Sequence, residues 1–310
     1  MNKYKYLLIL LIILLNHLEL FSQQVADSLY RPEISNKTYP NQGGAIIYID
    51  EGHNNFHTKD GRYYSFTKLL EQDGYQVESY NNIFNNVNLK EVDILVIANA
   101  LPDSIRPPIT TPTKSAFSKD EIKSLANWVK NGGALFLIGD HMPFAGAATE
   151  LANEFGFKFY DSFVMYNPEN GIIDFNKQKG TLSDNLITQG RNSKEKVNQV
   201  RTFTGQGFKI PKEAKSILNL EESQTVFLVD TMWVFNERVK RFPANELSQG
   251  AIMNIENGKV AFFGEAAMFS AQLSGPRRQK VGMNSENAKE NFQLLLNIIH
   301  WLDGKLEKEN

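Results

Sequence analysis

The sequence predicts an α/β protein built on a largely parallel β-sheet. Short, almost wholly apolar segments have the composition of strands buried on both faces, and segments with helical periodicity lie between them. Along the chain these segments follow the order β-α-β-β-α-β, which is typical of an α/β domain. The expected strands are residues 45–49, 75–80, 92–98 and 134–138, and the expected helices are residues 61–73 and 118–131.

The second of these helices carries the clearest local signal. Ser118 and Glu121 stand three residues apart, the spacing of a capping box in which each side chain bonds the backbone N–H of the other residue. Apolar residues follow at helical spacing, and Asn131-Gly132-Gly133 supplies a left-handed stop. We therefore expect this helix to begin after Ser118 and to end just before the glycine pair.

The second half of the chain is less regular. Residues 158–249 show no long helical pattern, and we interpret them as an irregular insert that covers one edge of the sheet. Two apolar segments at 250–255 and 259–263 flank Asn257-Gly258. Asn-Gly between such segments is a strong signal for a two-residue turn, so a late β-hairpin is predicted.

The N-terminus has the pattern of a secretory signal peptide over residues 1–22. Lys3 and Lys5 precede a short apolar run that falls well below the roughly 20 residues needed to span a bilayer. We expect export to the periplasm or the extracellular space, no stable membrane span after cleavage and no nucleotide cofactor; an uncleaved membrane anchor is the alternative. The remaining predicted parts are an extended lead-in at 23–43, a single domain at 44–303 that closes with a helix from about Ser285, and a polar tail at 304–310.

Composition narrows the possible functions. The chain has 310 residues, of which 42% are hydrophobic and 22% charged, with a formal net charge of −2. These values indicate a folded globular protein, and the near-neutral charge argues against a nucleic-acid partner. The chain has no cysteine, which excludes disulfides, thiolate zinc sites and a cysteine nucleophile.

Polar residues follow the predicted strands at the point where each strand ends. His53 and His57 follow the first strand, Asp140 and His141 follow the fourth, and Glu265 follows the second strand of the hairpin. Ligands of open α/β sheets bind beyond the carboxyl ends of the strands. We therefore predict a small-molecule site at this edge, built from these five side chains.

Two chemistries fit this set of side chains. Imidazoles and carboxylates are ligands for zinc or another divalent metal ion, so His53, His57, Asp140 and His141 are the predicted metal ligands. The same groups can act as general acid and base without a metal, and Asp140, His141 and Glu265 are the predicted catalytic residues. The sequence lacks a His-Glu-x-x-His motif. A third interpretation gives these residues no functional role: they end strands, cap helices and bind only water.

Four segments carry a family resemblance: residues 45–53, 92–98, 118–137 and 263–269. Together they resemble the class I glutamine amidotransferase-like superfamily, and more narrowly an exported branch of unknown function within it. The resemblance covers about residues 44–157 and 250–303. It implies a flavodoxin-like sheet flanked by helices, with a site near the turn at Gly139-Asp140-His141. The amidotransferases carry a cysteine at the comparable turn, and its absence here excludes glutamine hydrolysis through a thioester.

The leading hypothesis is an exported protein with a small-molecule site that catalyses metal-assisted hydrolysis. In this hypothesis Asp140 and His141 orient or deprotonate water, while His53 and His57 ligate the ion or polarise the substrate. The alternative is a non-catalytic module that binds a glycan, a peptide or a cell-envelope partner through the aromatic-rich segment 157–166 and the proline-rich loop 101–116. A hydrolase should gather at least three of the named side chains in a concave pocket, whereas a binding module should show an exposed aromatic patch.

Overall fold

The largest element of the structure is a mixed sheet of seven strands. A computed structural model describes residues 24–306, so the predicted signal peptide and the last four residues lie outside the described range. The strands of this sheet are β2 (Ile46–Asp50), β3 (Gln76–Tyr80), β4 (Ile94–Ala98), β5 (Ala134–Ile138), β9 (Lys215–Asn219), β12 (Ser248–Ile255) and β13 (Gly258–Phe263). Their order is β3-β2-β4-β5-β13-β12-β9. The first five run parallel, and β12 and β9 complete the sheet in antiparallel pairing.

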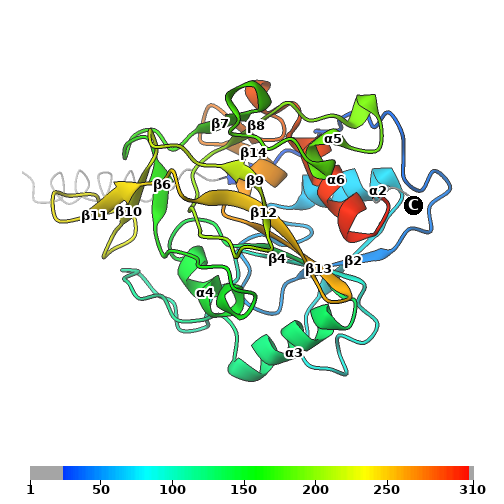
Figure 1. Cartoon of the computed structure of the whole chain (residues 1–310), viewed down its shortest axis with the longest axis horizontal. Coiled ribbons are helices and arrows are strands. Elements are labelled where there is room, and N and C mark those ends of the chain that lie inside the picture. The colour runs from blue at the N-terminus through cyan, green and yellow to red at the C-terminus, as the bar shows by residue number, and fades with distance from the viewer. Residues whose placement is uncertain (1–23, 307–310) are drawn as a thin grey trace, which may run out of the picture.

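Four helices supply side chains to the two buried clusters that form against this sheet. They are α2 (Tyr64–Asp73), α3 (Lys119–Lys130), α4 (Phe144–Glu154) and α6 (Asn291–Leu302). Leu70 of α2 and Leu295 of α6 belong to one cluster, whereas Leu125 of α3 and Leu151 of α4 belong to the other. In Figure 1, α3 and α4 lie together at the bottom of the view, and α2 and α6 lie together at the right.

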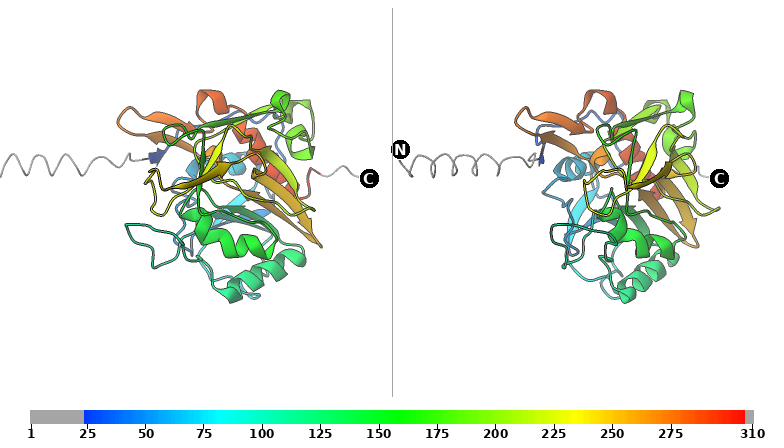
Figure 2. Two further views of the ribbon diagram at one scale, coloured as in Figure 1. Left: turned by 60° about the vertical axis from the view of Figure 1, so that its left-hand side comes forward. Right: turned by 90° about the vertical axis from the view of Figure 1, so that its left-hand side faces the viewer.

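Three smaller sheets add β-structure outside the central one. The strands β1, β14 and β15 form one sheet, β11, β10 and β6 form another, and β7 pairs with β8. In Figure 1 the sheet of β6, β10 and β11 projects at the left of the molecule, and Figure 2 shows β1 beside the strands near residues 271–282. The bounds are β1 (Gln24–Ala26), β6 (Phe163–Met165), β7 (Ile173–Asn176), β8 (Gln199–Thr202), β10 (Thr225–Leu228), β11 (Lys240–Pro243), β14 (Ala271–Ser274) and β15 (Gln279–Gly282), together with a short helix α5 (Leu186–Gln189) and 3-10 turns at Lys177–Lys179, Ser193–Glu195, Ala267–Phe269 and Glu286–Ala288.

The predicted fold class, an α/β protein with a flavodoxin-like, mostly parallel sheet flanked by helices, is wrong for this molecule. The chain is mostly β: within residues 24–306 the strands form four sheets, and most of their pairings are antiparallel. The predicted irregular insert at 158–249 is wrong for the same reason, because that region supplies strands to three of the sheets. Those strands, other than β9, are three or four residues long, too short for an alternating pattern to be recognised.

Local predictions that rested on capping and turn chemistry are confirmed. Ser118 and Glu121 form both bonds of the capping box at the start of α3. The strands β12 and β13 pair as an antiparallel hairpin around Glu256 and Asn257. Both features depend on residues close together in the chain, where the backbone pattern follows directly from the side chains.

Candidate functional site at the carboxyl edge of the parallel strands

Polar residues of four loops meet where the parallel strands of the central sheet end. Asp50 ends β2, Asn99 follows β4, Asp140 lies two residues beyond β5, and Glu265 lies two residues beyond β13. The parallel register aligns these ends at one edge. All four side chains are buried, so their hydrogen bonds decide which of them a ligand can reach.

The two carboxyl groups of Asp140 and Glu265 form a buried pair. Asp140 accepts the backbone N–H of His141 at 2.6 Å and that of Ala266 at 3.2 Å. Glu265 accepts the backbone N–H of Ala267 at 2.8 Å and that of Met268 at 2.7 Å. Burial raises the pKa of both carboxyls, and the proximity of Asp140 raises the pKa of Glu265 further. The pair therefore favours holding a proton, and its oxygens also organise the loop backbone around it.

His57 is held as a neutral imidazole with a defined tautomer. The Asn99 Oδ1 atom accepts the backbone N–H of Asp140 at 2.9 Å, so the Asn99 amide nitrogen is the donor to His57 Nδ1 at 3.2 Å. Burial, and to a lesser extent the charge of Arg62, lowers the pKa of His57 to about 3. Because Nδ1 accepts a hydrogen bond, the imidazole proton resides on Nε2, which is buried and without a partner.

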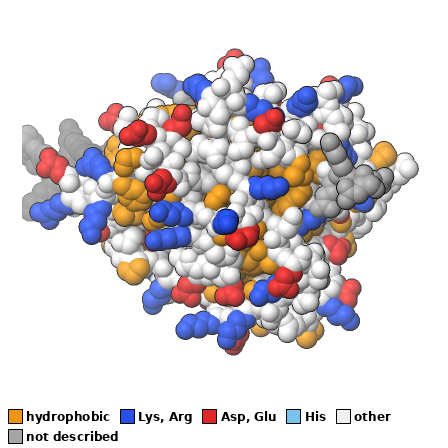
Figure 3. Space-filling view, viewed as in Figure 1, with side chains coloured by type: hydrophobic (Ala, Val, Ile, Leu, Met, Phe, Trp, Pro, Cys, Tyr) orange, Lys and Arg blue, Asp and Glu red, His pale blue; other side chains and the backbone are white. Residues whose placement is uncertain are grey.

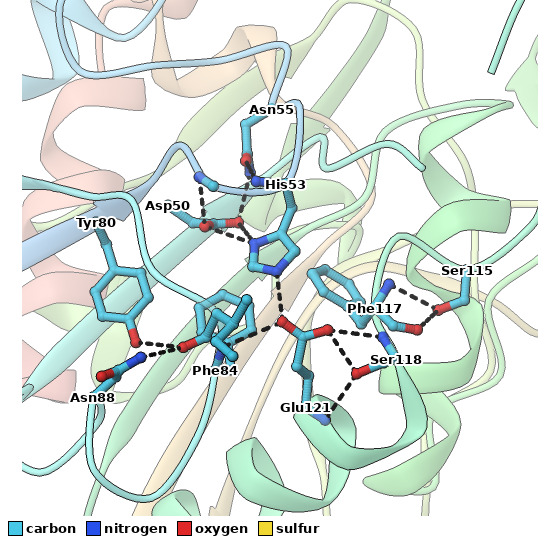
Figure 4. A network of polar contacts seen from close by, with 12 residues as sticks. Asp50, His53, Asn55, Tyr80, Phe84, Asn88, Ser115, Phe117, Ser118 and Glu121 are labelled. Atoms are coloured by element: carbon cyan, nitrogen blue, oxygen red, sulfur yellow. Dashed lines mark hydrogen bonds and ion pairs between the residues drawn. The ribbon is translucent and has the colours of Figure 1, made fainter. Parts of the chain in front are cut away.

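His53 links the loop after β2 to the start of α3 (Figure 4). Its Nδ1 lies 2.9 Å from Asp50 Oδ1, and its Nε2 lies 3.0 Å from Glu121 Oε1. The ring stacks on Phe84 with the centroids 4.4 Å apart. Both nitrogens are thus bonded to carboxylates, so His53 has no lone pair directed at a ligand.

The side chain of His141 lies in a row of rings that reaches the surface. We define the aromatic row as Phe56, Phe144, His141 and Trp233. Successive ring centroids are 5.3, 5.9 and 4.8 Å apart. Phe56 is 42% exposed and Trp233 51% exposed. His141 Nδ1 donates to the Met142 carbonyl at 2.6 Å, which leaves Nε2 as an acceptor when the ring is neutral.

The loop that carries Trp233 is attached to the proline-rich loop 101–116 through backbone hydrogen bonds. The N–H of Thr111 donates to the Asp230 carbonyl at 3.0 Å, and the N–H of Met232 donates to the Ile109 carbonyl at 2.9 Å. Ile109 and Met232 also pack on a small apolar cluster beneath the row. Figure 3 shows hydrophobic side chains gathered over β6 and β10, and no histidine is visible on the face drawn there.

The five predicted site residues divide into three environments. Asn99 bonds both His57 and the backbone of Asp140, and Asp140 accepts the N–H of Ala266 in the loop of Glu265, so these side chains lie in one buried region. His141 lies in the aromatic row beside it, and His53 is enclosed by two carboxylates. Within residues 24–306 no group of three or more His, Asp or Glu side chains is placed to hold a metal ion. Two cavities of about 690 and 610 Å³ open elsewhere, and none of the five residues lines either of them.

The structure adds residues that the sequence did not single out as site residues. Asn99 connects the histidine to the acid pair from a left-handed backbone conformation, with φ at 55°. Trp233 comes from the region interpreted as an irregular insert, Phe56 lies between predicted elements, and Arg62 lies at the start of the helix predicted over residues 61–73. The place of Asn99 directly after a buried strand could have identified it as a site residue from the sequence. The position of Trp233 could not be predicted, because it depends on pairing between loops that are distant in the chain.

Comparisons with known proteins give structural likeness only. No family model matches the chain, and no curated protein matches it. The N-terminal domain of mmIFT52 superimposes with a TM-score of 0.55 at 17% identity, covering 83% of this chain and 97% of that one. A cytoplasmic protein from Salmonella typhimurium has a TM-score of 0.47 at 13% identity, with 83% and 98% covered. A ThuA-like protein from Bacteroides uniformis has a TM-score of 0.42 at 12% identity, with 88% and 94% covered.

These identities are too low to assign an activity, and the likeness to the mmIFT52 domain concerns the fold alone. The structural neighbours of the chain also include a second ThuA-like protein, from Parabacteroides merdae, with a TM-score of 0.44 at 11% identity.

Proposed function

We propose that this protein is an exported, non-catalytic module that binds a glycan along the aromatic row. The observation that carries the proposal is the exposure of two large rings, Phe56 and Trp233, on either side of His141. Exposed aromatic side chains usually mark a binding surface, because burying them releases ordered water at little cost in side-chain entropy. The basic and apolar segments before residue 22 support export.

A glycan matches the chemistry of this row. The C–H groups on the face of a sugar ring pack against an aromatic face, which carries partial negative charge. Sugar hydroxyls then need polar partners close to the rings, and His141 Nε2 offers an acceptor between Phe144 and Trp233.

Hydrolysis is the second candidate, favoured by the buried Asp140 and Glu265 pair. Burial raises the pKa of both carboxyl groups, and a carboxyl group that holds its proton can act as a general acid. One observation argues against this candidate. Each of the four carboxylate oxygens of Asp140 and Glu265 already accepts a backbone N–H, so these oxygens serve the loop structure rather than a substrate. Both side chains are also almost fully buried, so a substrate would have to displace part of the loop structure to reach them.

A glycan array followed by calorimetry tests the proposal. Trp233→Ala should weaken binding of the retained glycans on the order of tenfold, as expected for removal of an aromatic stacking contact. Val87→Ala is the control, because Val87 is an exposed apolar residue outside the row and its removal should leave affinity unchanged.

The same experiment separates the candidates. Retention of peptides but no glycan, or equal losses in both variants, would contradict the proposal. Release of reducing ends from bound glycans that stops in Asp140→Asn would replace it with hydrolysis.

A further inference from the structure

Arg62 lies at one end of the aromatic row with a guanidinium group that lacks an acidic partner. Its Cζ atom lies 3.7 Å from the centroid of the Phe56 ring. Among residues 24–306 no carboxylate pairs with it, and its buried Nε has no hydrogen-bond acceptor. The pKa of Arg62 is lowered by burial alone. A partly buried cation without a counter-ion is costly, because part of its hydration is lost without replacement.

His57 provides a second unpaired donor beside this cation. Its Nε2 carries the imidazole proton, since Nδ1 accepts from Asn99, and Nε2 finds no acceptor. The side chain is 3% exposed and lies close enough to Arg62 for the two groups to interact electrostatically. Both residues therefore carry an N–H donor without an acceptor, which makes this corner electropositive and favours an anion beside the partly exposed Arg62 guanidinium, while the buried His57 Nε2 is itself closed to a ligand.

The start of α2 adds to the positive character of this corner. The helix begins at Tyr64, two residues after Arg62, and its first turn contains no acidic residue and no side-chain cap. The amino end of a helix carries a partial positive charge. The helix α3 differs, with Asp120 and Glu121 in its first turn and a complete capping box, whereas α4 and α6 begin without acidic residues as α2 does.

We propose that the glycan bound along the aromatic row is acidic, and that its carboxylate or sulfate group pairs with Arg62 while neighbouring sugars stack on the exposed rings. This inference rests on the proposed function, because it assigns the chemical class of the same ligand. A planar guanidinium can form two parallel hydrogen bonds to either anion, which fixes the orientation of the sugar that carries it. The stacking of Arg62 on Phe56 holds the guanidinium beside the row.

The test compares neutral, uronic-acid-containing and sulfated oligosaccharides of matched length on wild-type protein and on two variants. Arg62→Met removes the unpaired cation, and Lys68→Met removes a cation of α2 that is already paired with Glu71 at 2.6 Å. We expect Arg62→Met to weaken binding of acidic glycans by about tenfold or more, as for loss of a charge-assisted bidentate contact. Lys68→Met should leave affinity unchanged.

A second measurement does not depend on any variant. Raising the salt concentration from about 0.1 M to about 1 M should weaken binding of the acidic glycan by wild-type protein, and binding of the neutral one should change little.

If Arg62→Met does not fold, Arg62→Lys retains the charge without the planar fork and should reduce the affinity for acidic glycans by a smaller factor.

The outcomes separate this inference from the proposed function. Equal affinity for neutral and acidic glycans, lost in Trp233→Ala but not in Arg62→Met, would overturn the acidic ligand and leave glycan binding intact. Failure to bind any glycan would overturn both. A preference for uronic acids or for sulfated sugars identifies which anion the site takes.

Discussion

At the scale of single residues, His53 shows how two carboxylates determine the charge of a buried imidazole. Burial disfavours the imidazolium form, but the hydrogen bonds and charges of Asp50 and Glu121 outweigh it and raise the pKa of His53. A group whose pKa is raised on folding contributes its stability fully below the unfolded pKa. That contribution is lost as the pH rises through the folded pKa.

Glu121→Gln tests this reasoning, since glutamine also serves in a capping box. We expect the variant to lose about 1–3 kcal/mol of unfolding free energy at pH 6, where His53 is charged, because a buried charge-assisted bond is removed. The loss should be smaller at pH 9, where His53 is closer to neutral. Urea denaturation at both pH values measures the difference.

The control is Glu71→Gln, which breaks the partly exposed pair with Lys68. If Glu121→Gln lost the same unfolding free energy at both pH values, the assignment of a charged His53 would be contradicted.

The positions of the candidate site residues along the chain could be predicted, but their environments could not. Asp140, His141 and Glu265 follow parallel strands, and the common direction of those strands brings them to one edge. Nothing near His53 in the sequence shows that Glu121, 68 residues away, occupies its second nitrogen. A ligand role depends on which lone pairs stay free, and that is decided by tertiary packing.

At the scale of elements, the β12–β13 hairpin is attached to the end of α3 through Gly258. A Cβ atom at this position would lie 1.9 Å from the Val129 carbonyl oxygen and 2.5 Å from that of Gly133. The hairpin backbone therefore packs directly on the helix terminus. Asn-Gly predicts the turn from the sequence, but the glycine is also required by this close contact.

Gly258→Ala should destabilise the protein by about 1–3 kcal/mol, as for overpacking against backbone that has to move. Asn254→Ala is the matched control on the same hairpin, because Asn254 is exposed and surface changes cost within about 0.5 kcal/mol. Thermal or urea denaturation compares the two variants. Similar stability of both would show that the contact relaxes without cost.

At the scale of the whole molecule, the lead-in before the central sheet is part of the folded body. The strand β1 pairs with β14, and Thr38 Oγ1 lies 2.7 Å from His300 Nε2. Tyr39 donates its hydroxyl to Asp303 at 2.7 Å. The segment thus covers the buried His300–Asp73 pair, whose atoms are 2.7 Å apart.

A chain that begins at residue 44 should therefore fold poorly or unfold at a clearly lower temperature than the full chain. Removal of the lead-in exposes the buried hydrogen bond between His300 and Asp73 and leaves an edge of β14 unpaired. Calorimetry of both chains measures the effect, and Thr38→Ala, expected to cost about 1–2 kcal/mol, is the milder version. A truncated chain as stable as the full one would contradict this role.

The overall architecture was the part of the fold least accessible from the sequence. Apolar segments such as residues 134–138 identify individual strands, and the capping box identifies α3, because both depend on local composition. The sheet formed by β6, β10 and β11 joins segments more than 50 residues apart, and strands of three or four residues carry too little pattern to be paired in advance.

The main-chain bonds that join the loops near Thr111 and Asp230 have an evolutionary consequence. Because these carbonyl and amide groups join the two loops whatever side chain stands at position 233, a residue that meets a ligand there can be exchanged while the pairing of the loops is kept. Point substitutions at the rim could then redirect such a module to new saccharides, and divergence among its homologues should concentrate there while the neighbouring buried acids stay fixed.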